Sequence, residues 1–204
     1  MAKEQSRKKN KQVDSTLTRR DKIIQVAARI FAEKGYHGTT LDEIAHELVI
    51  TKPALYYHIK SKEDLLREII NSILEPLETI SKVKDLDLSP REKLQKIIIL
   101  MVISGAERQD TTTILFQDIS ILPKRKRDAI RRREKEIERS VQEILREGQE
   151  KGDFIVDDVK IASYGIMGAA NWIYRWYNPD GTFTPEQIAD KIVQLVENGY
   201  LKRQ

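Results

Sequence analysis

A helix-start pattern recurs along this chain and constrains its fold more than any other feature. At four predicted helix starts a serine or threonine stands three residues ahead of an acid or an amide, so that the two side chains can cap free N–H groups at the helix N-terminus. Glycine and proline are scarce, at 9 and 6 of 204 residues, and alternating β-branched runs are absent. The pattern therefore predicts an all-α chain. The pairs are Thr40 with Glu43, Ser61 with Asp64, Ser89 with Glu92, and Thr184 with Gln187.

The predicted helices fall into two groups. The first three are short and joined by tight turns, whereas most of the following six are longer. We assign residues 1–17 to a disordered basic arm, 18–65 to an N-terminal three-helix unit and 66–204 to a larger C-terminal helical domain. The helices are expected near 19–34, 40–47, 52–58, 61–83, 90–107, 111–120, 124–150, 158–177 and 184–200.

Charge is concentrated at the N-terminal end. Residues 1–65 hold 13 Lys and Arg against 9 Asp and Glu, while the remainder holds 23 of each. A local positive field of this kind attracts polyanions. No cysteine is present, and the longest uncharged stretch, between Lys160 and Arg175, has 14 residues, short of the roughly 20 that a membrane span needs. We expect a cytoplasmic protein with no membrane segment and no signal peptide.

The third predicted helix has two different faces. Leu55 and Ile59 form an apolar face that can join a small core. No carboxylate occurs from Val49 to Ser61. A face that carries donors and excludes acids suits phosphates and base edges. The outward residues are Lys52, Pro53, Tyr56, Tyr57 and His58.

Four segments of this N-terminal unit resemble the signature of the TetR family of transcriptional regulators, over roughly residues 19–66. The resemblance implies a helix-turn-helix DNA-binding domain at 18–65 and a ligand-binding and dimerisation domain at 66–204. It also implies a homodimer that binds a palindromic operator in double-stranded DNA, as a repressor, and is released by a small lipophilic effector. The segments are Gly35–Thr40 (GYHGTT), Glu43–Ala45 (EIA), Thr51–His58 (TKPALYYH) and Lys60–Leu65 (KSKEDL).

The same resemblance implies roles for ten residues in DNA binding. Thr39 and Thr40 would meet the phosphate backbone, and Tyr56 would reach a base or the backbone. Lys62 would lie in the first turn of a helix, whose positive end favours anions. The remaining contacts would be to bases from Thr51, Lys52, Pro53 and Ala54, and to phosphates from Tyr57 and His58.

Two departures from the family pattern lie in this unit. Val49 stands where the family usually has a glycine in the turn, and a left-handed conformation at a β-branched residue costs about 1–2 kcal/mol. We therefore expect a reshaped turn or an extended second helix. Leu41 and Asp42 stand where some relatives have basic or polar base-reading residues, so we expect readout mainly from the third helix.

The helix predicted at 158–177 carries small residues and tryptophans on one stripe. Small residues permit close approach of a partner helix, and tryptophans supply large buried area. We expect a homodimer formed through the helices near 124–150, 158–177 and 184–200; the resemblance implies the last long helices without deciding which pair. The alternative is that the stripe packs only within its own subunit. It comprises Gly165, Gly168, Ala169, Trp172 and Trp176.

A mixed apolar and polar stripe lies on the opposite side of the same helix, and residues 97–104 are apolar nearly all round. A buried helix beside isolated polar groups can form a pocket wall. These residues can equally be ordinary core. The candidate ligand-binding residues are Met101, Ser104, Phe116, Tyr164, Met167, Asn171, Tyr174 and Arg175.

The segments Asn171–Gly181 and Thr184–Ala189 are similar to the ending of TetR regulators of fatty-acid and sterol-ring breakdown, several of which respond to acyl-CoA thioesters. This implies an acyl-CoA effector, with Arg175 and Arg108 as candidates for its phosphates. Two alternatives remain open: a multidrug-type sensor of lipophilic compounds, and a DNA-binding dimer that needs no ligand.

Motifs for other functions are missing. The chain has no G-x-S-x-G, P-loop, H-E-x-x-H or G-x-G-x-x-G sequence, so we expect no enzyme and no cofactor. The three histidines match no zinc spacing, so we expect no metal. The basic runs Lys124–Arg127 and Arg131–Arg133 precede Glu134, Glu136 and Glu138, and i,i+3 and i,i+4 pairing favours a solvated helix face.

Overall fold

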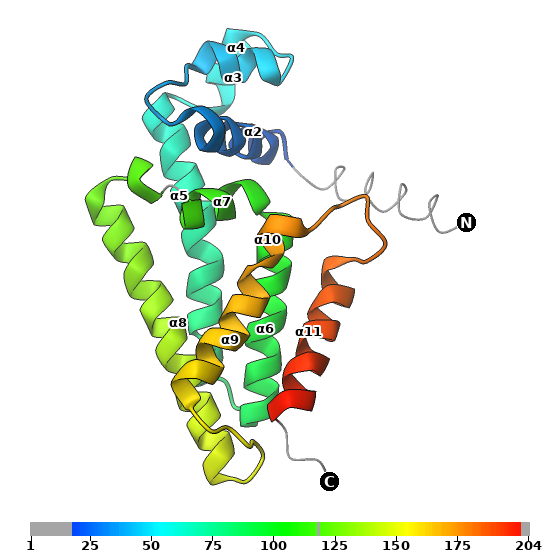
Figure 1. Cartoon of the computed structure of the whole chain (residues 1–204). Coiled ribbons are helices and arrows are strands. Elements are labelled where there is room, and N and C mark those ends of the chain that lie inside the picture. Colours follow the sequence, from blue (N-terminus) through cyan, green and yellow to red (C-terminus); the bar gives the residue numbers. More distant parts are fainter. Residues whose placement is uncertain (1–17, 118, 201–204) are drawn as a thin grey trace. The chain divides into compact units, whose positions relative to one another are not determined.

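A computed structural model describes residues 18–117 and 119–200, and this part of the chain is helical with no strand (Figure 1). The all-α prediction is confirmed. The predicted arm at 1–17 lies outside the described residues. The elements are α2 (Arg19–Lys34), α3 (Leu41–Glu47), α4 (Lys52–His58), α5 (Lys62–Ser81), η1 (Val83–Asp85), α6 (Pro90–Glu107), α7 (Gln109–Gln117), η2 (Ile119–Ile121), α8 (Lys124–Glu150), α9 (Val159–Asn171), α10 (Ile173–Trp176) and α11 (Pro185–Tyr200).

The capping pairs that predicted the helix starts are formed. Thr40 and Glu43 cap each other reciprocally at α3, as Ser89 and Glu92 do at α6. At α5 the Ser61 hydroxyl accepts a hydrogen bond from the Asp64 N–H. Thr184 and Gln187 form the pair at α11. Because each cap satisfies backbone groups that the first turn leaves free, the starts can be predicted to within one or two residues.

Helix ends differ more from the prediction. The single helix expected over 158–177 is divided at Trp172, where the Arg175 N–H donates to the Trp172 carbonyl, a tighter i−3 bond. The helix expected over 111–120 begins earlier, at Gln109, and ends at Gln117. The first difference arises where backbone bonding shortens a turn, which side-chain periodicity does not report.

The described chain forms two compact units, and the first is built from three separate segments. Its described part comprises residues 18–73, 108–117, 119–126 and 178–182. Its core is made by α2, α3 and α4, and α7, whose Ile114 is fully buried, packs against α2. The sequence-based boundary at residue 65 falls inside α5 and stays a prediction. The buried apolar residues of the three N-terminal helices include Ile23, Ala27, Phe31, Ile44 and Leu55.

The second unit is organised around α6, which lies beside α9 and α11 (Figure 1). Ile97, Ile98 and Val102 are fully buried on α6, while Ile99 and Leu100 are partly buried. The helix is thus mostly, but not completely, enclosed. The other helices contribute Val141, Ile144, Leu145, Ala162, Ile166, Ala189 and Val193.

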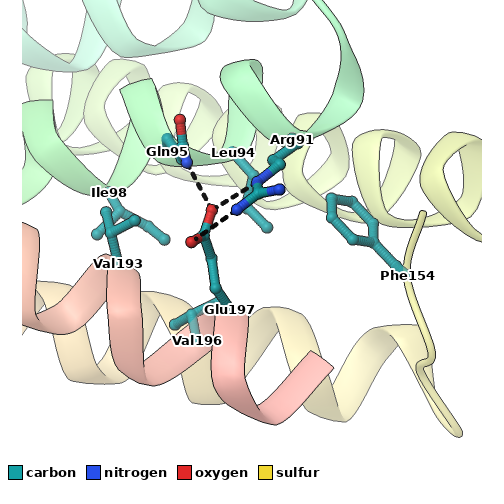
Figure 2. Close-up of a pocket in the computed structure, with 8 residues that line it drawn as sticks. All are labelled: Arg91, Leu94, Gln95, Ile98, Phe154, Val193, Val196 and Glu197. Carbon is teal, nitrogen blue, oxygen red and sulfur yellow. Dashed lines mark hydrogen bonds and ion pairs between the residues drawn. The ribbon is translucent and has the colours of Figure 1, made fainter. Parts of the chain in front are cut away.

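An ion-paired clasp joins α6 to α11 (Figure 2). The Glu197 carboxylate accepts hydrogen bonds from Arg91 Nε at 2.8 Å, Arg91 Nη2 at 3.1 Å and Gln95 Nε2. The bond from Arg91 holds the pKa of Glu197 below its usual range. The clasp borders a small apolar hollow lined by Leu94, Ile98, Phe154, Val193 and Val196. Its role is therefore to fix α11 on α6.

Helix α5 contains a proline in its interior, Pro76. Proline has no N–H, so the carbonyl of Ser72, four residues earlier, loses its normal helical donor. Arg108 Nη1 donates to this carbonyl at 2.8 Å instead. The border between the two units lies between Ile73 and Leu74, in the same turn. A side chain from the start of α7 thus completes the backbone bonding of α5.

Candidate nucleic-acid interface

Helix α4 divides cleanly into a buried and an exposed face. Leu55 and Ile59 are buried in the unit's core. Tyr57 is 87% exposed and Tyr56 45% exposed, and the first turn from Thr51 to Ala54 is exposed throughout. His58 is half-buried, with its ring edge-on to Tyr57. The donor-rich side of the helix faces outward, as the DNA-binding hypothesis requires.

The start of α4 is fixed by its own residues. The Thr51 hydroxyl accepts a hydrogen bond from the Ala54 N–H, and Pro53 occupies the first turn, where its missing N–H is harmless. The first turn contains no acid. The free N–H groups of this turn and the ammonium of Lys52 make the start of α4 favourable for anions.

The turn before α4 keeps its left-handed residue despite the missing glycine. Val49 has φ of 53° and is 90% exposed. The expectation of a reshaped turn or an extended α3 is therefore wrong. The Val49 N–H donates to His46 and the Ile50 N–H to Ala45, and these bonds hold the turn. The backbone bonds outweigh the local steric cost.

The two threonines before α3 differ in accessibility. Thr40 is exposed at the helix start, where it caps α3. Thr39 is only 1% exposed, and its hydroxyl donates to the Gly35 carbonyl at 2.9 Å. The prediction that the Thr39 side chain meets a phosphate is corrected here, because that hydroxyl is already used inside the fold.

Lys62 is positioned by an aromatic ring that the sequence did not single out. Its ammonium lies 4.4 Å from the centre of the Tyr36 ring, in a cation–π contact. Tyr36 in turn packs edge-on against the buried Phe31. Because the contact joins α5 to the loop after α2, no local pattern could have predicted it. It orients the Lys62 charge before any ligand binds.

Helix α3 is joined to its neighbours by ion pairs. Arg29 pairs with Glu47, and Lys34 pairs with Glu43 at 3.2 Å, which ties α3 to α2. The Lys52 ammonium lies 2.9 Å from the Asp42 carboxylate, which ties α4 to α3. This hydrogen bond raises the pKa of Lys52 above its usual value. Sequence reasoning noted Asp42 as a departure but missed this partnership.

The candidate ligand residues are scattered. Met101 is buried in the core of the second unit and Met167 is partly buried against it. The Ser104 hydroxyl donates to Leu100 in its own helix. The Tyr164 hydroxyl donates to Glu138 at the surface, and this bond raises the Tyr164 pKa.

The other four candidate ligand residues do not gather around one pocket either. Asn171 and Tyr174 are half-buried and Arg175 is exposed. Phe116 belongs to the first unit and is 43% exposed. The hollow beside Glu197 and a charged hollow between α2 and α3 are lined by other residues. The assignment of these eight residues to a ligand stays a prediction.

Two further observations concern other kinds of site. Within residues 18–117 and 119–200, no group of three or more His, Asp or Glu side chains is placed to hold a metal ion. In the same ranges, no helix combines the length and the apolar character that crossing a bilayer demands.

A small three-helix unit that presents a donor-rich helix outward, in a chain whose second unit is also helical, defines a helix-turn-helix transcriptional regulator. The chain belongs to the TetR family. Residues 23–69 match the family of bacterial regulatory proteins, tetR family, and residues 87–200 match the tetracyclin repressor-like C-terminal domain.

Relatives of the chain include repressors and a ligand-bound regulator. The HTH-type transcriptional repressor KstR2 of Mycolicibacterium smegmatis is 31% identical over 92% of this chain and 93% of its own length. The ketosteroid transcriptional regulator KstR2 of Mycobacterium tuberculosis has a similar structure, with a TM-score of 0.72 and 26% identity over 91% and 96% of the two chains. AibR, solved with isovaleryl coenzyme A and operator DNA, has a TM-score of 0.65 and is 30% identical over 87% of this chain and 97% of its own.

Proposed function

We propose that this chain is a homodimeric repressor that binds a palindromic operator through α4 and is released by an acyl-CoA thioester. The outward face of α4 carries the proposal, because its exposed donors and its lack of acids suit the major groove. On this proposal the chain acts in the cytoplasm and catalyses no reaction. The relatives are regulators, which supports the assignment.

The dimer is proposed to form through α9 and α11. Ile161 and Leu195 are strongly exposed apolar residues on these helices, and Trp172 and Trp176 follow at the C-terminal end of α9 and on α10. A Cβ added at Gly168 would meet no atom within 4 Å in the subunit, which leaves room for a partner helix. Two such subunits would hold their α4 helices about 34–36 Å apart for successive major grooves.

Helix α8 is a poor candidate for pairing across a two-fold axis. Arg131, Arg132 and Arg139 are exposed on its outer face. The same face would meet itself in a symmetric interface, so like charges would be brought together. One pairing predicted in the sequence with the acids that follow, Arg133 with Glu136, is formed. Electrostatics therefore favours α9 and α11 over α8.

The effector is proposed to be an acyl-CoA thioester, with an apolar chain in the second unit. AibR is described with isovaleryl coenzyme A, and KstR2 as a ketosteroid regulator, which supports a lipophilic thioester class. Binding would favour a different setting of α5, which begins at Lys62. The ligand acts only through its different affinity for the two states, and reversing a 99:1 equilibrium needs about 5.5 kcal/mol of such difference.

The DNA-binding assignment is tested with unbiased selection of bound fragments followed by two variants. Lys62→Ala should weaken binding to all sequences alike and lower the salt slope by about one unit, as for one lost phosphate contact. Lys52→Ala should change which sequence is preferred. If both variants lower affinity equally for every site, the assignment of readout to α4 is wrong.

The effector class is tested by gel-shift titration of the selected operator. Acyl-CoA thioesters of different chain length should release the protein, whereas free coenzyme A at the same concentration should not. Failure of every thioester to release DNA would overturn the effector class while leaving the DNA-binding function intact.

A further inference from the structure

An acid stands beside the first cation of the proposed recognition helix. Asp42 and Lys52 form an ion pair at 2.9 Å between side chains that are 64% and 53% exposed. Exposed pairs of this kind contribute little to stability. A carboxylate at a surface meant for polyanions also repels phosphates. The first turn of α3 favours an acid at this position, but general DNA affinity does not explain a carboxylate beside Lys52.

The position of Asp42 is fixed by its surroundings. The reciprocal cap between Thr40 and Glu43 sets the first turn of α3, which contains Asp42. The ion pair of Arg29 with Glu47 holds the other end of the helix on α2. Asp42 therefore presents its carboxylate from a rigid element rather than from a loop.

Together the two side chains present a donor next to an acceptor. An ammonium only donates hydrogen bonds and a carboxylate only accepts them. In the major groove, guanine offers the acceptors O6 and N7, and the paired cytosine offers the N4 amino donor beside them. Lysine favours guanine and aspartate favours the cytosine amino group, so both preferences coincide in one base pair.

We propose that Asp42 is a specificity-determining residue that, with Lys52, reads one G·C base pair in each operator half-site. Lys52 donates to guanine while Asp42 accepts from the N4 amino group of cytosine. On non-operator DNA the carboxylate keeps Lys52 occupied and repels phosphates, so it lowers non-specific affinity. The inference rests on the proposed DNA-binding function and adds a reader on α3.

The test compares wild type, Asp42→Ala, Lys52→Ala and the matched control Glu33→Ala, which removes an acid from α2 without touching Lys52. Operators selected by wild type are first substituted base by base, and the pair read by Lys52 is the one at which Lys52→Ala loses its preference. Cytosine at that pair is then replaced by 2-pyrimidinone, which lacks the N4 amino group. Circular dichroism confirms that each variant is folded.

Wild type and Glu33→Ala should lose about tenfold in affinity for the analogue operator, whereas Asp42→Ala should bind both operators equally. Asp42→Ala should also bind non-operator DNA more tightly, with a salt slope steeper by about one unit, because Lys52 becomes free for a phosphate. An Asp42→Ala protein as sensitive to the analogue as wild type, or an A·T pair at this position, overturns the inference. A wild type that selects no sequence overturns the proposed function itself.

Discussion

The turn at Val49 is strained, because a β-branched residue adopts a left-handed backbone there, and it gives a residue-scale prediction. Val49→Gly should raise the free energy of unfolding by about 0.5–1 kcal/mol. Relief of the left-handed conformation is worth about 1–2 kcal/mol, and the greater freedom of glycine in the unfolded chain offsets about half of it. Little packing is lost because Val49 is 90% exposed. Urea denaturation measures the change.

Val49→Ala is the matched control for this turn. Alanine also disfavours positive φ, so it should not produce the gain that glycine gives. Equal stabilisation by both substitutions would mean that loss of the exposed valine side chain, and not relief of the backbone, is responsible.

Single residues also show how far the sequence alone could predict the site. Tyr57 and Lys52 were placed correctly on an outward face, because helical periodicity around Leu55 leaves them no other side. Thr39 was misplaced, because its buried hydroxyl bonds to Gly35, a local backbone contact that no period encodes. The Tyr36–Lys62 contact was missed because it depends on how α5 lies against the loop after α2.

At the scale of elements, α5 depends on a side chain from outside the helix. Arg108→Ala should lower stability by about 1–3 kcal/mol, because the Ser72 carbonyl loses its donor. The loss should be smaller in a Pro76→Ala background, where residue 76 regains an N–H and can bond Ser72 within the helix. Thermal unfolding of the four proteins of this double-mutant cycle gives the coupling energy. A coupling of zero would show that Arg108 does not replace the missing helical bond.

The ion pair of Arg91 with Glu197, which joins α6 to α11, predicts that the free energy of unfolding depends on pH. The pKa of Glu197 is lowered by its bonds from Arg91, so its contribution to stability is present above the unfolded pKa of about 4.3 and is lost as pH falls through the lower folded value. Glu197→Gln should therefore cost about 1 kcal/mol at pH 7 and progressively less in acid.

Asp190→Asn on the same helix is the control for the clasp, since Asp190 is exposed and lies outside it. Urea denaturation at several pH values compares the two variants. A Glu197→Gln deficit that stayed constant down to pH 3 would contradict the role of the ionised clasp.

Helix ends were predictable where a side chain caps them, and less so where only backbone geometry sets them. The helix starts at Thr40 and Ser89 follow from their caps. The division at Trp172 follows from one tightened backbone bond and has no marker in the side chains. Gly148 is similar: a Cβ there would meet the ring of Phe154, a contact set by the return of the chain after α8.

For the whole molecule, the proposed dimer depends on open space at Gly168. Gly168→Leu should leave the subunit folded, because its Cβ would meet no atom of its own chain within 4 Å. It should nevertheless block a partner helix and give monomers in sedimentation velocity, with loss of tight operator binding. Lys96→Leu, which adds the same side chain to an exposed site on α6, should remain dimeric. A dimeric Gly168→Leu protein would place the interface elsewhere.

Effector binding should also raise the stability of the folded protein. A ligand that binds only the folded protein adds about 2.7 kcal/mol at 100 times its Kd, so an acyl-CoA thioester should raise the melting temperature in step with its concentration. Free coenzyme A serves as the control. A thioester that releases DNA without any rise in melting temperature would contradict its binding to the folded protein as the cause of release.

The three-segment construction of the first unit has a consequence for anyone building hybrid sensors from this chain. Exchanging only the opening 65 or so residues for another DNA-binding unit would remove α2, against which α7 packs, and would divide α5 near its start. A transplant that carries residues 1–73 and 108–126 together keeps both the packing of α7 on α2 and the hydrogen bond from Arg108 to Ser72. The first unit is defined by contacts between segments that are distant in the sequence. Dividing the chain at a single position therefore cannot separate it from the second unit.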